Sequence, residues 1–137
     1  MDTRIIGDIA EYRFVLYCIQ RGIEICKPLN SSLQSDFVIR LNNEYKRVQV
    51  KSRQLKDGKI ADISKFKQQK TKDKKLIEYN STNIDLYVVY CPENDTFYNI
   101  PLDVLNSIGY TLVLRVDKPK NGQLKGVRLA EDYILAL

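Results

Sequence analysis

Two polar side chains on one predicted strand could take part in catalysis. The segment KRVQVKSR at 46–53 alternates Val48 and Val50 with Gln49 and Lys51. Successive side chains of a strand point to opposite faces, so the amide and the ammonium share one face and the valines share the other. An amide oxygen can coordinate a metal ion, and an ammonium can stabilise developing negative charge. Such chemistry needs acidic partners from elsewhere in the chain.

Asp36 is the nearest acidic candidate in the sequence. It begins a predicted strand at 36–41, which the segment NNE joins to the next strand in a tight hairpin. A two-residue loop at 43–44 places Asp36 opposite Lys51, whereas a three-residue loop turns it toward Val50. The hairpin therefore permits Asp36 to join the site without fixing its register.

Glu11 is a second acidic candidate, on a predicted helix at 3–21 that ends at Gly22. Apolar residues at roughly helical spacing predict this helix, and they are Ile5, Ile9, Val15, Leu16 and Ile19. A helix packed on the sheet could aim Glu11 at the same spot as the other three groups.

Together, Glu11, Asp36, Gln49 and Lys51 would supply three oxygen donors and one ammonium. Mg²⁺ favours oxygen ligands and keeps water at its other positions. Water coordinated to a metal ion is a more acidic nucleophile than free water, and a lysine can orient it or stabilise charge on a phosphate. Each residue alone also has a plain structural explanation: a solvated helix residue, a turn cap or an exposed strand face.

The absence of histidine from the 137 residues narrows the possible chemistry. Ser-His and Cys-His catalysis and histidine-ligated zinc or iron are excluded within this chain. A metal ion must be held mainly by oxygen, which favours Mg²⁺, Mn²⁺ or Ca²⁺. The three cysteines, Cys18, Cys26 and Cys91, form no CxxC pair and are predicted to be small buried hydrophobes.

The order of predicted elements indicates one α/β domain over residues 1–137, with a mixed sheet that contains an antiparallel hairpin. After the hairpin we expect a basic helical or loop segment at 56–75, a central strand at 84–91, a strand at 96–101, a helix at 101–108, a strand at 110–117 and a short C-terminal helix or tail. The N-terminus lacks a signal-peptide layout and no apolar run is long enough to span a membrane, so we expect a cytoplasmic protein without a membrane partner.

Positive charge is concentrated in the segment 56–75, which has eight lysines and three aspartates. Its net charge of +5 equals that of the whole chain, so the rest of the sequence is neutral in sum. The segment is either a solvated face or a phosphate-binding track beside the catalytic strand. The second interpretation gives the candidate DNA-binding residues Arg53, Lys56, Lys59, Lys65, Lys67, Lys70, Lys72, Lys74 and Lys75.

Three short motifs, GDIAE, SDFVI and VQVKSR, follow one another in an order and at spacings that resemble the PD-(D/E)XK, or restriction-like, nucleases. The resemblance is greatest to small group I intron-encoded homing endonucleases of this type and more distant to archaeal junction resolvases. It implies a restriction-endonuclease-like core, in which helices flank a mixed central sheet. Asp36 would be the central metal ligand, Glu11 a ligand directly or through water, Gln49 a ligand through its amide oxygen, and Lys51 the catalytic lysine.

The sequence departs from the family pattern at two positions. Ser35 stands where a proline is often found, and Gln49 stands where most members have Glu or Asp. The neutral amide removes one negative charge from the site, so we expect weaker metal binding.

The resemblance implies a metal-dependent endonuclease that hydrolyses phosphodiester bonds in double-stranded DNA, in the role of a site-specific homing enzyme. Its cofactor would be Mg²⁺, with Mn²⁺ as a substitute and Ca²⁺ binding without turnover. Cutting both strands requires at least a dimer, and a tetramer would suit a long target. The alternatives are a junction-resolving or repair nuclease, a catalytically impaired DNA-binding module with Gln49 as the symptom, and a basic RNA-associated structural protein.

Overall fold

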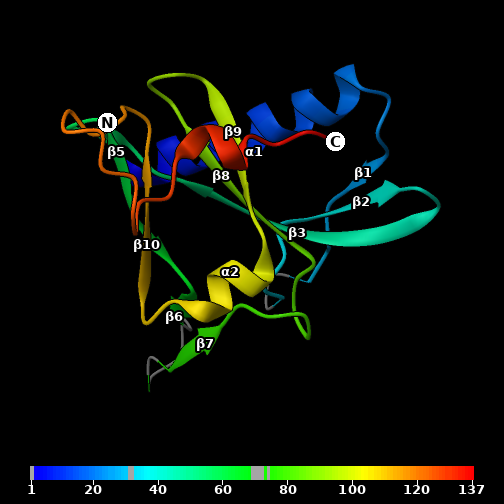
Figure 1. Cartoon of the computed structure of the whole chain (residues 1–137). Coiled ribbons are helices and arrows are strands. Elements are labelled where there is room, and N and C mark those ends of the chain that lie inside the picture. The colour runs from blue at the N-terminus through cyan, green and yellow to red at the C-terminus, as the bar shows by residue number, and fades with distance from the viewer. Residues whose placement is uncertain (1, 31–32, 69–72, 74) are drawn as a thin grey trace.

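The structure is a computed structural model that describes residues 2–30, 33–68, 73 and 75–137. Its elements in chain order are α1 (Thr3–Gln20), β1 (Ile25–Cys26), β2 (Phe37–Leu41), β3 (Glu44–Ser52), β4 (Leu55–Lys56), β5 (Lys59–Ser64), β6 (Phe66–Gln68), β7 (Leu76–Glu78), β8 (Leu86–Cys91), β9 (Thr96–Ile100), α2 (Leu102–Ser107), β10 (Thr111–Arg115) and the 3-10 helix η1 (Ala130–Tyr133) (Figure 1). Within the described residues, no helix has the length and apolar character needed to cross a membrane.

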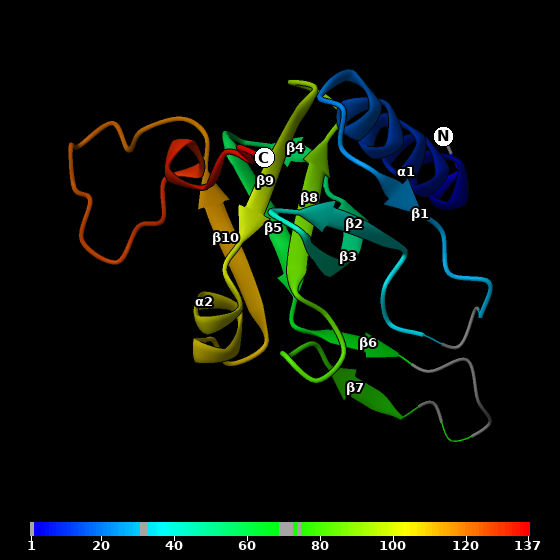
Figure 2. The same ribbon diagram turned by 90° about the vertical axis from the view of Figure 1, so that its right-hand side faces the viewer.

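A five-stranded mixed sheet in the order β1-β2-β3-β8-β9 forms the centre of the molecule. Strands β3 and β8 run parallel, and the other neighbouring pairs are antiparallel. Helix α1 covers one face, where Phe14 packs with Val48 and Val88 in a buried cluster. Figure 2 shows α1 on one side of this sheet, and β10 and α2 on the other. The predicted mixed sheet with flanking helices is therefore confirmed.

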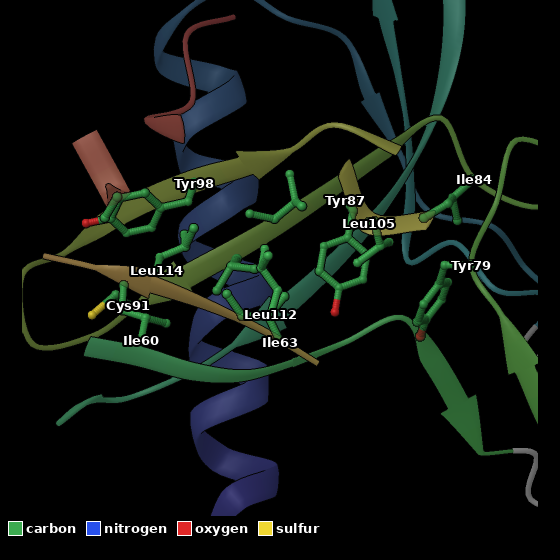
Figure 3. Close-up of a cluster of buried hydrophobic side chains, with 13 residues drawn as sticks. Ile60, Ile63, Tyr79, Ile84, Tyr87, Cys91, Tyr98, Leu105, Leu112 and Leu114 are labelled. Atoms are coloured by element: carbon green, nitrogen blue, oxygen red, sulfur yellow. The ribbon is translucent and has the colours of Figure 1, made fainter. Parts of the chain in front are cut away.

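The opposite face of the central sheet packs on a second, three-stranded sheet in the order β10-β5-β4. The prediction of a helical or loop segment at 56–75 was wrong for β4, β5 and β6. Ile60 and Ile63 are three residues apart, which matches a helical period, but both are fully buried from a strand (Figure 3). A bulge reconciles the spacing with the strand, because Ile63 pairs with Leu112 whereas Ile60 pairs with Leu114.

The β2–β3 hairpin turns through Asn42 and Asn43, whose φ angles are +51° and +64°. Two residues with positive φ are typical of the tight turns that match strand twist, and asparagine tolerates this conformation. Leu41 therefore pairs with Glu44, and both predicted registers of the hairpin were wrong. The chain turns one residue earlier than expected, since the two asparagines form the loop by themselves.

Helix α1 matches its predicted bounds closely, but the predicted apolar stripe is not its buried side. The buried residues of α1 are Ala10, Phe14 and Cys18. Four stripe residues are exposed on the outer side, namely Ile5, Ile9, Leu16 and Ile19. The small and aromatic residues of the other side fit closely against the sheet, which leaves the larger aliphatic stripe without a partner inside this chain's described residues.

The three cysteines do not share one environment. Cys18 and Cys91 are buried, as predicted, on α1 and β8. Cys26 is exposed, so its predicted burial was wrong. It lies on β1, a two-residue strand at the edge of the central sheet, where packing covers little of the side chain.

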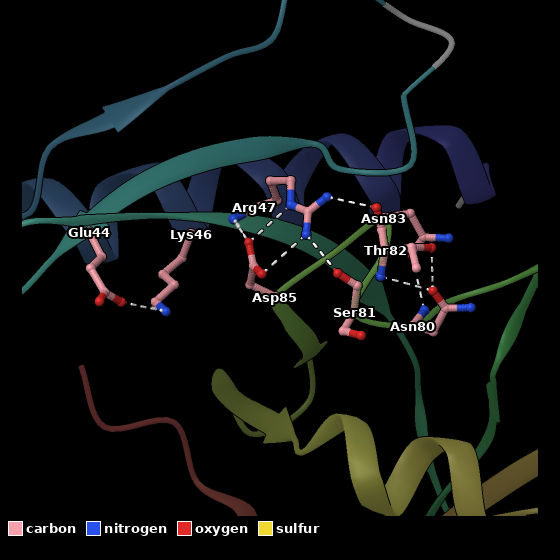
Figure 4. A network of polar contacts seen from close by, with 8 residues as sticks. All are labelled: Glu44, Lys46, Arg47, Asn80, Ser81, Thr82, Asn83 and Asp85. Carbon is pink, nitrogen blue, oxygen red and sulfur yellow. Dashed lines mark hydrogen bonds and ion pairs between the residues drawn. The ribbon is translucent and has the colours of Figure 1, made fainter.

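Arg47 of β3 anchors the loop that leads into β8 (Figure 4). Its guanidinium contacts both carboxylate oxygens of Asp85, at 3.0 and 3.2 Å, and donates to the carbonyls of Ser81 and Thr82 at 2.9 Å. The backbone N–H of Arg47 also donates to Asp85, at 2.7 Å. This network fixes the start of the parallel β3–β8 pair, because Arg47 immediately precedes the first paired residue, Val48.

Replacing Asp85 with alanine should lower the free energy of unfolding by about 1–2 kcal/mol, because three charge-assisted hydrogen bonds are lost from a partly exposed network. Denaturant titration followed by circular dichroism measures this. Glu44→Ala is the matched control, since it removes an exposed ion pair with Lys46 from the same strand and should change stability little. Equal losses in the two variants would contradict an anchoring role.

Candidate active site

A cleft of about 880 Å³ opens between the N-terminal half of α1, the end of β3 and the β4–β5 hairpin. All four predicted site residues line it: Glu11, Asp36, Gln49 and Lys51. They come from three separate elements of the chain. The structure therefore brings together every residue of the predicted set in one solvent-accessible space.

Asp36 takes the place of a missing strand partner at the end of β3. The β2–β3 ladder stops at the pair Phe37–Val48, and β3 continues four residues further to Ser52. Asp36 immediately precedes β2, and its Oδ2 accepts the backbone N–H of Val50 at 2.9 Å. The short β2 thus opens the sheet beside the valine–glutamine–lysine segment, and the carboxylate satisfies the backbone there.

Gln49 is 5% exposed, and its amide orientation follows from its neighbours. Its nitrogen lies 2.8 Å from Asp36 Oδ2 and 3.1 Å from the Val50 carbonyl oxygen. Both neighbours can only accept hydrogen bonds, so the amide must present its NH₂ to them. The amide oxygen Oε1 is left buried without a hydrogen-bond partner among the described residues. A buried, unpaired oxygen is costly unless a ligand uses it.

The donor set fits a divalent metal ion bound by oxygen. Oε1 of Gln49 is unpaired, and of the two Asp36 oxygens only Oδ2 accepts hydrogen bonds from the described residues. Glu11 lines the same cleft from α1. No three His, Cys, Asp or Glu side chains gather anywhere in the described part of the chain. A site here therefore relies on a neutral third ligand, which the amide of Gln49 can provide.

Burial disfavours the ionised forms of both acids, and for Glu11 the charge of Asp36 adds to this effect. The pKa of Glu11 is raised by burial first and then by the negative charge of Asp36, while the charge of Lys27 opposes the rise. Burial also raises the pKa of Asp36, against the hydrogen bond from Val50 and three nearby lysines. A divalent cation bound between the two carboxylates would reverse this effect, since it favours their charged forms.

Lys51 lies next to Val89 of β8 in the sheet, and its ammonium is partly withdrawn from water. Its Nζ lies 5.4 Å from the centroid of the Tyr79 ring, a contact in which the ring face favours a cation. Burial, and then the charges of Arg53 and Lys67, lower the pKa of Lys51 to about 8, although Asp36 opposes this. The amine can therefore gain or lose a proton near neutral pH.

Three of the predicted DNA-binding residues line the cleft opposite α1: Arg53, Lys56 and Lys59. Part of the Arg53 guanidinium is already used, because it donates to the carbonyls of Ser52 and Asp62 at 2.7 and 2.8 Å. The β4–β5 segment thus gives the cleft a wall of mixed charge, in which these three cations outnumber two aspartates, Asp57 and Asp62. This wall faces Glu11 and Asp36 across the cleft.

The remaining predicted DNA-binding residues are distributed differently. Lys67 is close enough to Asp36 and Lys51 for its charge to lower the pKa of both. Lys65 turns into the protein, where Nζ donates to the Ile108 carbonyl at 2.8 Å, and Lys75 is exposed before β7. Lys70, Lys72 and Lys74 lie outside the described residues.

Sequence reasoning missed two residues beside the site. Lys27 follows β1, whose Cys26 pairs with Val38, and its Nζ lies 5.5 Å from the Phe37 ring centroid. A prediction that β1 pairs with β2 would have located Lys27 near Asp36. Tyr79 comes from the loop before β8, and no local pattern in the sequence indicates that it would lie under Lys51.

Two comparisons with known proteins match this chain over nearly its whole length. The family described as PD-(D/E)XK endonuclease matches residues 1–136. Among solved structures, the bacterial homing endonuclease I-Ssp6803I aligns with a TM-score of 0.78 at 25% sequence identity, over 98% of this chain and 89% of that chain. No curated protein sequence matches the chain. The similarity spans nearly the full length of both chains and confirms the predicted restriction-endonuclease-like fold.

Replacing Lys51 with methionine should stabilise the metal-free protein at pH 7, by up to about 3 kcal/mol. The pKa of Lys51 is about 8 in the folded protein, whereas a lysine in the unfolded chain has the ordinary value of 10.5. The buried charge therefore costs stability fully below pH 8, and this cost disappears as the pH rises toward 10.5. The gain in melting temperature should accordingly shrink between pH 8 and pH 10.5.

Lys46→Met is the control for this prediction, because Lys46 lies on the same strand but its side chain is 37% exposed. It should give no comparable stabilisation. A Lys51→Met variant whose melting temperature is equal to or below that of the wild type at pH 7 would refute the buried-charge interpretation.

Proposed function

Because the chain belongs to the PD-(D/E)XK endonuclease family, whose members generally use divalent metal ions, we propose that it is a Mg²⁺-dependent endonuclease of double-stranded DNA. The observation that carries the proposal is the convergence of Glu11, Asp36, Gln49 and Lys51 on one cleft. Three cationic side chains and two aspartates line its opposite wall. The reaction is the hydrolysis of a phosphodiester bond.

Asp36, Glu11 and the amide oxygen of Gln49 would hold the ion. When bound, a divalent ion lowers the pKa of water and offsets negative charge on the phosphate. Mn²⁺ would substitute for Mg²⁺, and Ca²⁺ would bind without turnover. The hydrogen bond from the Gln49 amide to Asp36 keeps the carboxylate and the amide oxygen in fixed relative positions. The site therefore has its ligands in place before the ion arrives.

Lys51 acts on the phosphate from the sheet. Its protonated amine can donate hydrogen bonds to a phosphate oxygen as charge develops there. The lowered pKa of about 8 also permits the neutral amine to take a proton from the attacking water. Both roles require the amine at the cleft surface. The Tyr79 ring, whose centroid lies 5.4 Å from Nζ, stabilises the charged amine there.

Arg53, Lys56 and Lys59 would bind DNA phosphates along the cleft. The likeness to a bacterial homing endonuclease supports a site-specific homing role. One site cuts one strand, so a double-strand cut at defined positions requires at least a dimer, and a tetramer would extend the region of DNA that is read. A cytoplasmic location is part of this proposal and rests on the sequence-based expectation alone.

Incubation with a mixed DNA library and Mg²⁺ tests the proposal. The wild type should cut a subset of sequences, and Lys51→Ala should cut at least about 100-fold more slowly, because it removes a donor to the charged phosphate. Asp36→Asn should abolish cutting but retain DNA binding in Ca²⁺. Lys46→Ala, on the same strand outside the cleft, should cut normally.

Three outcomes would overturn parts of this proposal. Unchanged cutting by Lys51→Ala would remove Lys51 from the site, and retained cutting by Asp36→Asn would remove the metal anchor. Selective cutting of branched DNA with little sequence preference would indicate a junction resolvase. Metal-independent binding without any cutting would indicate a DNA-binding module.

Replacing Gln49 with glutamate should make the protein's stability depend on Mg²⁺. Without metal, the new carboxylate loses the donated hydrogen bond and repels Asp36, so the free energy of unfolding should fall by about 1–3 kcal/mol. Added Mg²⁺ should restore it, because binding to the folded state alone stabilises that state. Thermal melting with and without Mg²⁺ measures the difference.

Gln54→Glu is the matched control, since Gln54 lines the same cleft but forms no hydrogen bond with Asp36. It should show the same small Mg²⁺-induced shift as the wild type. An equal shift in both variants would mean that residue 49 does not face the ion.

A further inference from the structure

The outer side of α1 has a continuous apolar stripe that nothing in the described chain covers. Its five residues alternate at spacings of four and three, and they are Ile5, Ile9, Tyr12, Leu16 and Ile19. They are 50%, 38%, 76%, 44% and 62% exposed, respectively. Figure 2 shows α1 at the periphery, with no other element beyond it. This spacing is the heptad pattern of helices that pair side by side.

We propose that the α1 stripe pairs in parallel with the α1 stripe of a second copy of this chain, about a two-fold axis along the helices. Such a pairing buries the same residues on both copies, as a two-fold interface requires. It deepens the proposed nuclease function, on which its biological purpose rests, because it supplies the second cutting site. The contact itself does not depend on that function.

Two charged residues that flank the stripe favour a second copy in parallel orientation. Ile9 and Leu16 occupy position a of the heptad, which places Asp8 at g and Arg13 at e. In a parallel pair, position g of one helix faces position e of the other, five residues further along. Asp8 would therefore meet Arg13 of the second copy, twice by symmetry. Both side chains are exposed, and neither forms an ion pair with a described residue.

Shallow grooves on both sides of the stripe have complementary charge. The groove on the g side, about 380 Å³, contains Asp8 and Glu11 with one lysine, Lys27. The groove on the e side, about 330 Å³, contains two arginines, Arg13 and Arg21, with one aspartate. Parallel pairing brings the g-side groove of each copy against the e-side groove of the other. An acidic surface then meets a basic one across both halves of the contact.

These grooves also provide area that the helix alone lacks. Helix α1 has 18 residues and is about 27 Å long, which is short for an isolated helical pair. The exposed Ile134 lines the e-side groove together with Leu16. The stripe therefore continues into a wider apolar surface, which brings the contact closer to the size of a stable interface.

The parallel orientation places both cutting sites at one end of the pair. The residues of α1 that line the catalytic cleft belong to its first half, from Thr3 to Glu11. Two helices that run the same way present both clefts in the same direction, toward one DNA molecule. An antiparallel pair would orient the two N-terminal halves in opposite directions.

Light scattering after size-exclusion chromatography tests the pairing without reference to cleavage. The wild type should have at least twice the mass of one chain. Leu16→Glu should halve the measured mass of the assembly, from dimer to monomer or from tetramer to dimer. Leu124→Glu is the matched control, because Leu124 is 51% exposed on another surface, and it should leave the mass unchanged.

A charge exchange tests the orientation. Asp8→Arg and Arg13→Asp should each weaken self-association about tenfold, since two attractive pairs become repulsive. An equimolar mixture of the two variant chains should form a heterodimer as readily as the wild type, because every flanking pair is then attractive. In an antiparallel pair these positions do not meet, so the mixture would not be rescued.

A wild type that is monomeric at every soluble concentration, an unchanged mass for Leu16→Glu, or failure of the mixture to associate would overturn the proposal. Circular dichroism checks that each variant is folded. These outcomes are separate from loss of the nuclease function, because mass is measured without DNA or metal. A dimeric protein without activity would sustain the pairing and overturn the proposed function.

Discussion

The arrangement of the site depends on one carboxylate that substitutes for a strand. Because β2 begins at Phe37, the last residues of β3 have no partner on that side, and Asp36 accepts the N–H of Val50 instead. The missing strand opens the sheet to the cleft, and the same oxygen fixes the Gln49 amide. A longer β2 would satisfy this backbone better, and it would close the space in which we propose that a phosphate and an ion meet.

This arrangement opposes stability in the empty protein. Burial disfavours the charged forms of Glu11, Asp36 and Lys51 alike. It raises the pKa of the two acids and lowers the pKa of Lys51. Gln49 adds an unpaired oxygen. Groups with such unfavourable burial are typical of ligand-binding sites. A cation bound by oxygen would stabilise the two carboxylates and the amide oxygen, and a phosphate beside it would stabilise the ammonium. Gln49 also limits the cost, because a fourth ionisable group at its position would add another buried charge.

The sequence predicted local features well and non-local ones poorly. Alternation within β3 correctly placed Gln49 and Lys51 on one face, since side-chain direction in a strand needs no tertiary information. The hairpin register was missed because Asn42 and Asn43 can both adopt positive φ, which moved the turn by one residue. The position of Lys27 beside the site was not predicted, because it depends on the pairing of a two-residue strand. The many charged residues of the 56–75 segment favoured a helix or loop in the prediction, so the bulged strand that buries Ile60 was missed.

Helix α1 shows why an apolar periodicity does not by itself identify a core-facing side. Its buried side uses small and aromatic residues, Ala10, Phe14 and Cys18, which allow a close approach to the sheet. Four aliphatic residues, Ile5, Ile9, Leu16 and Ile19, are exposed on the other side. Their contact with water is unfavourable, and nothing within the described chain offsets it. The first half of the same helix also forms one wall of the cleft that holds Asp36, Gln49 and Lys51. A contact between two copies through this helix would therefore set the spacing of two cutting sites directly, with a single rigid element between interface and chemistry.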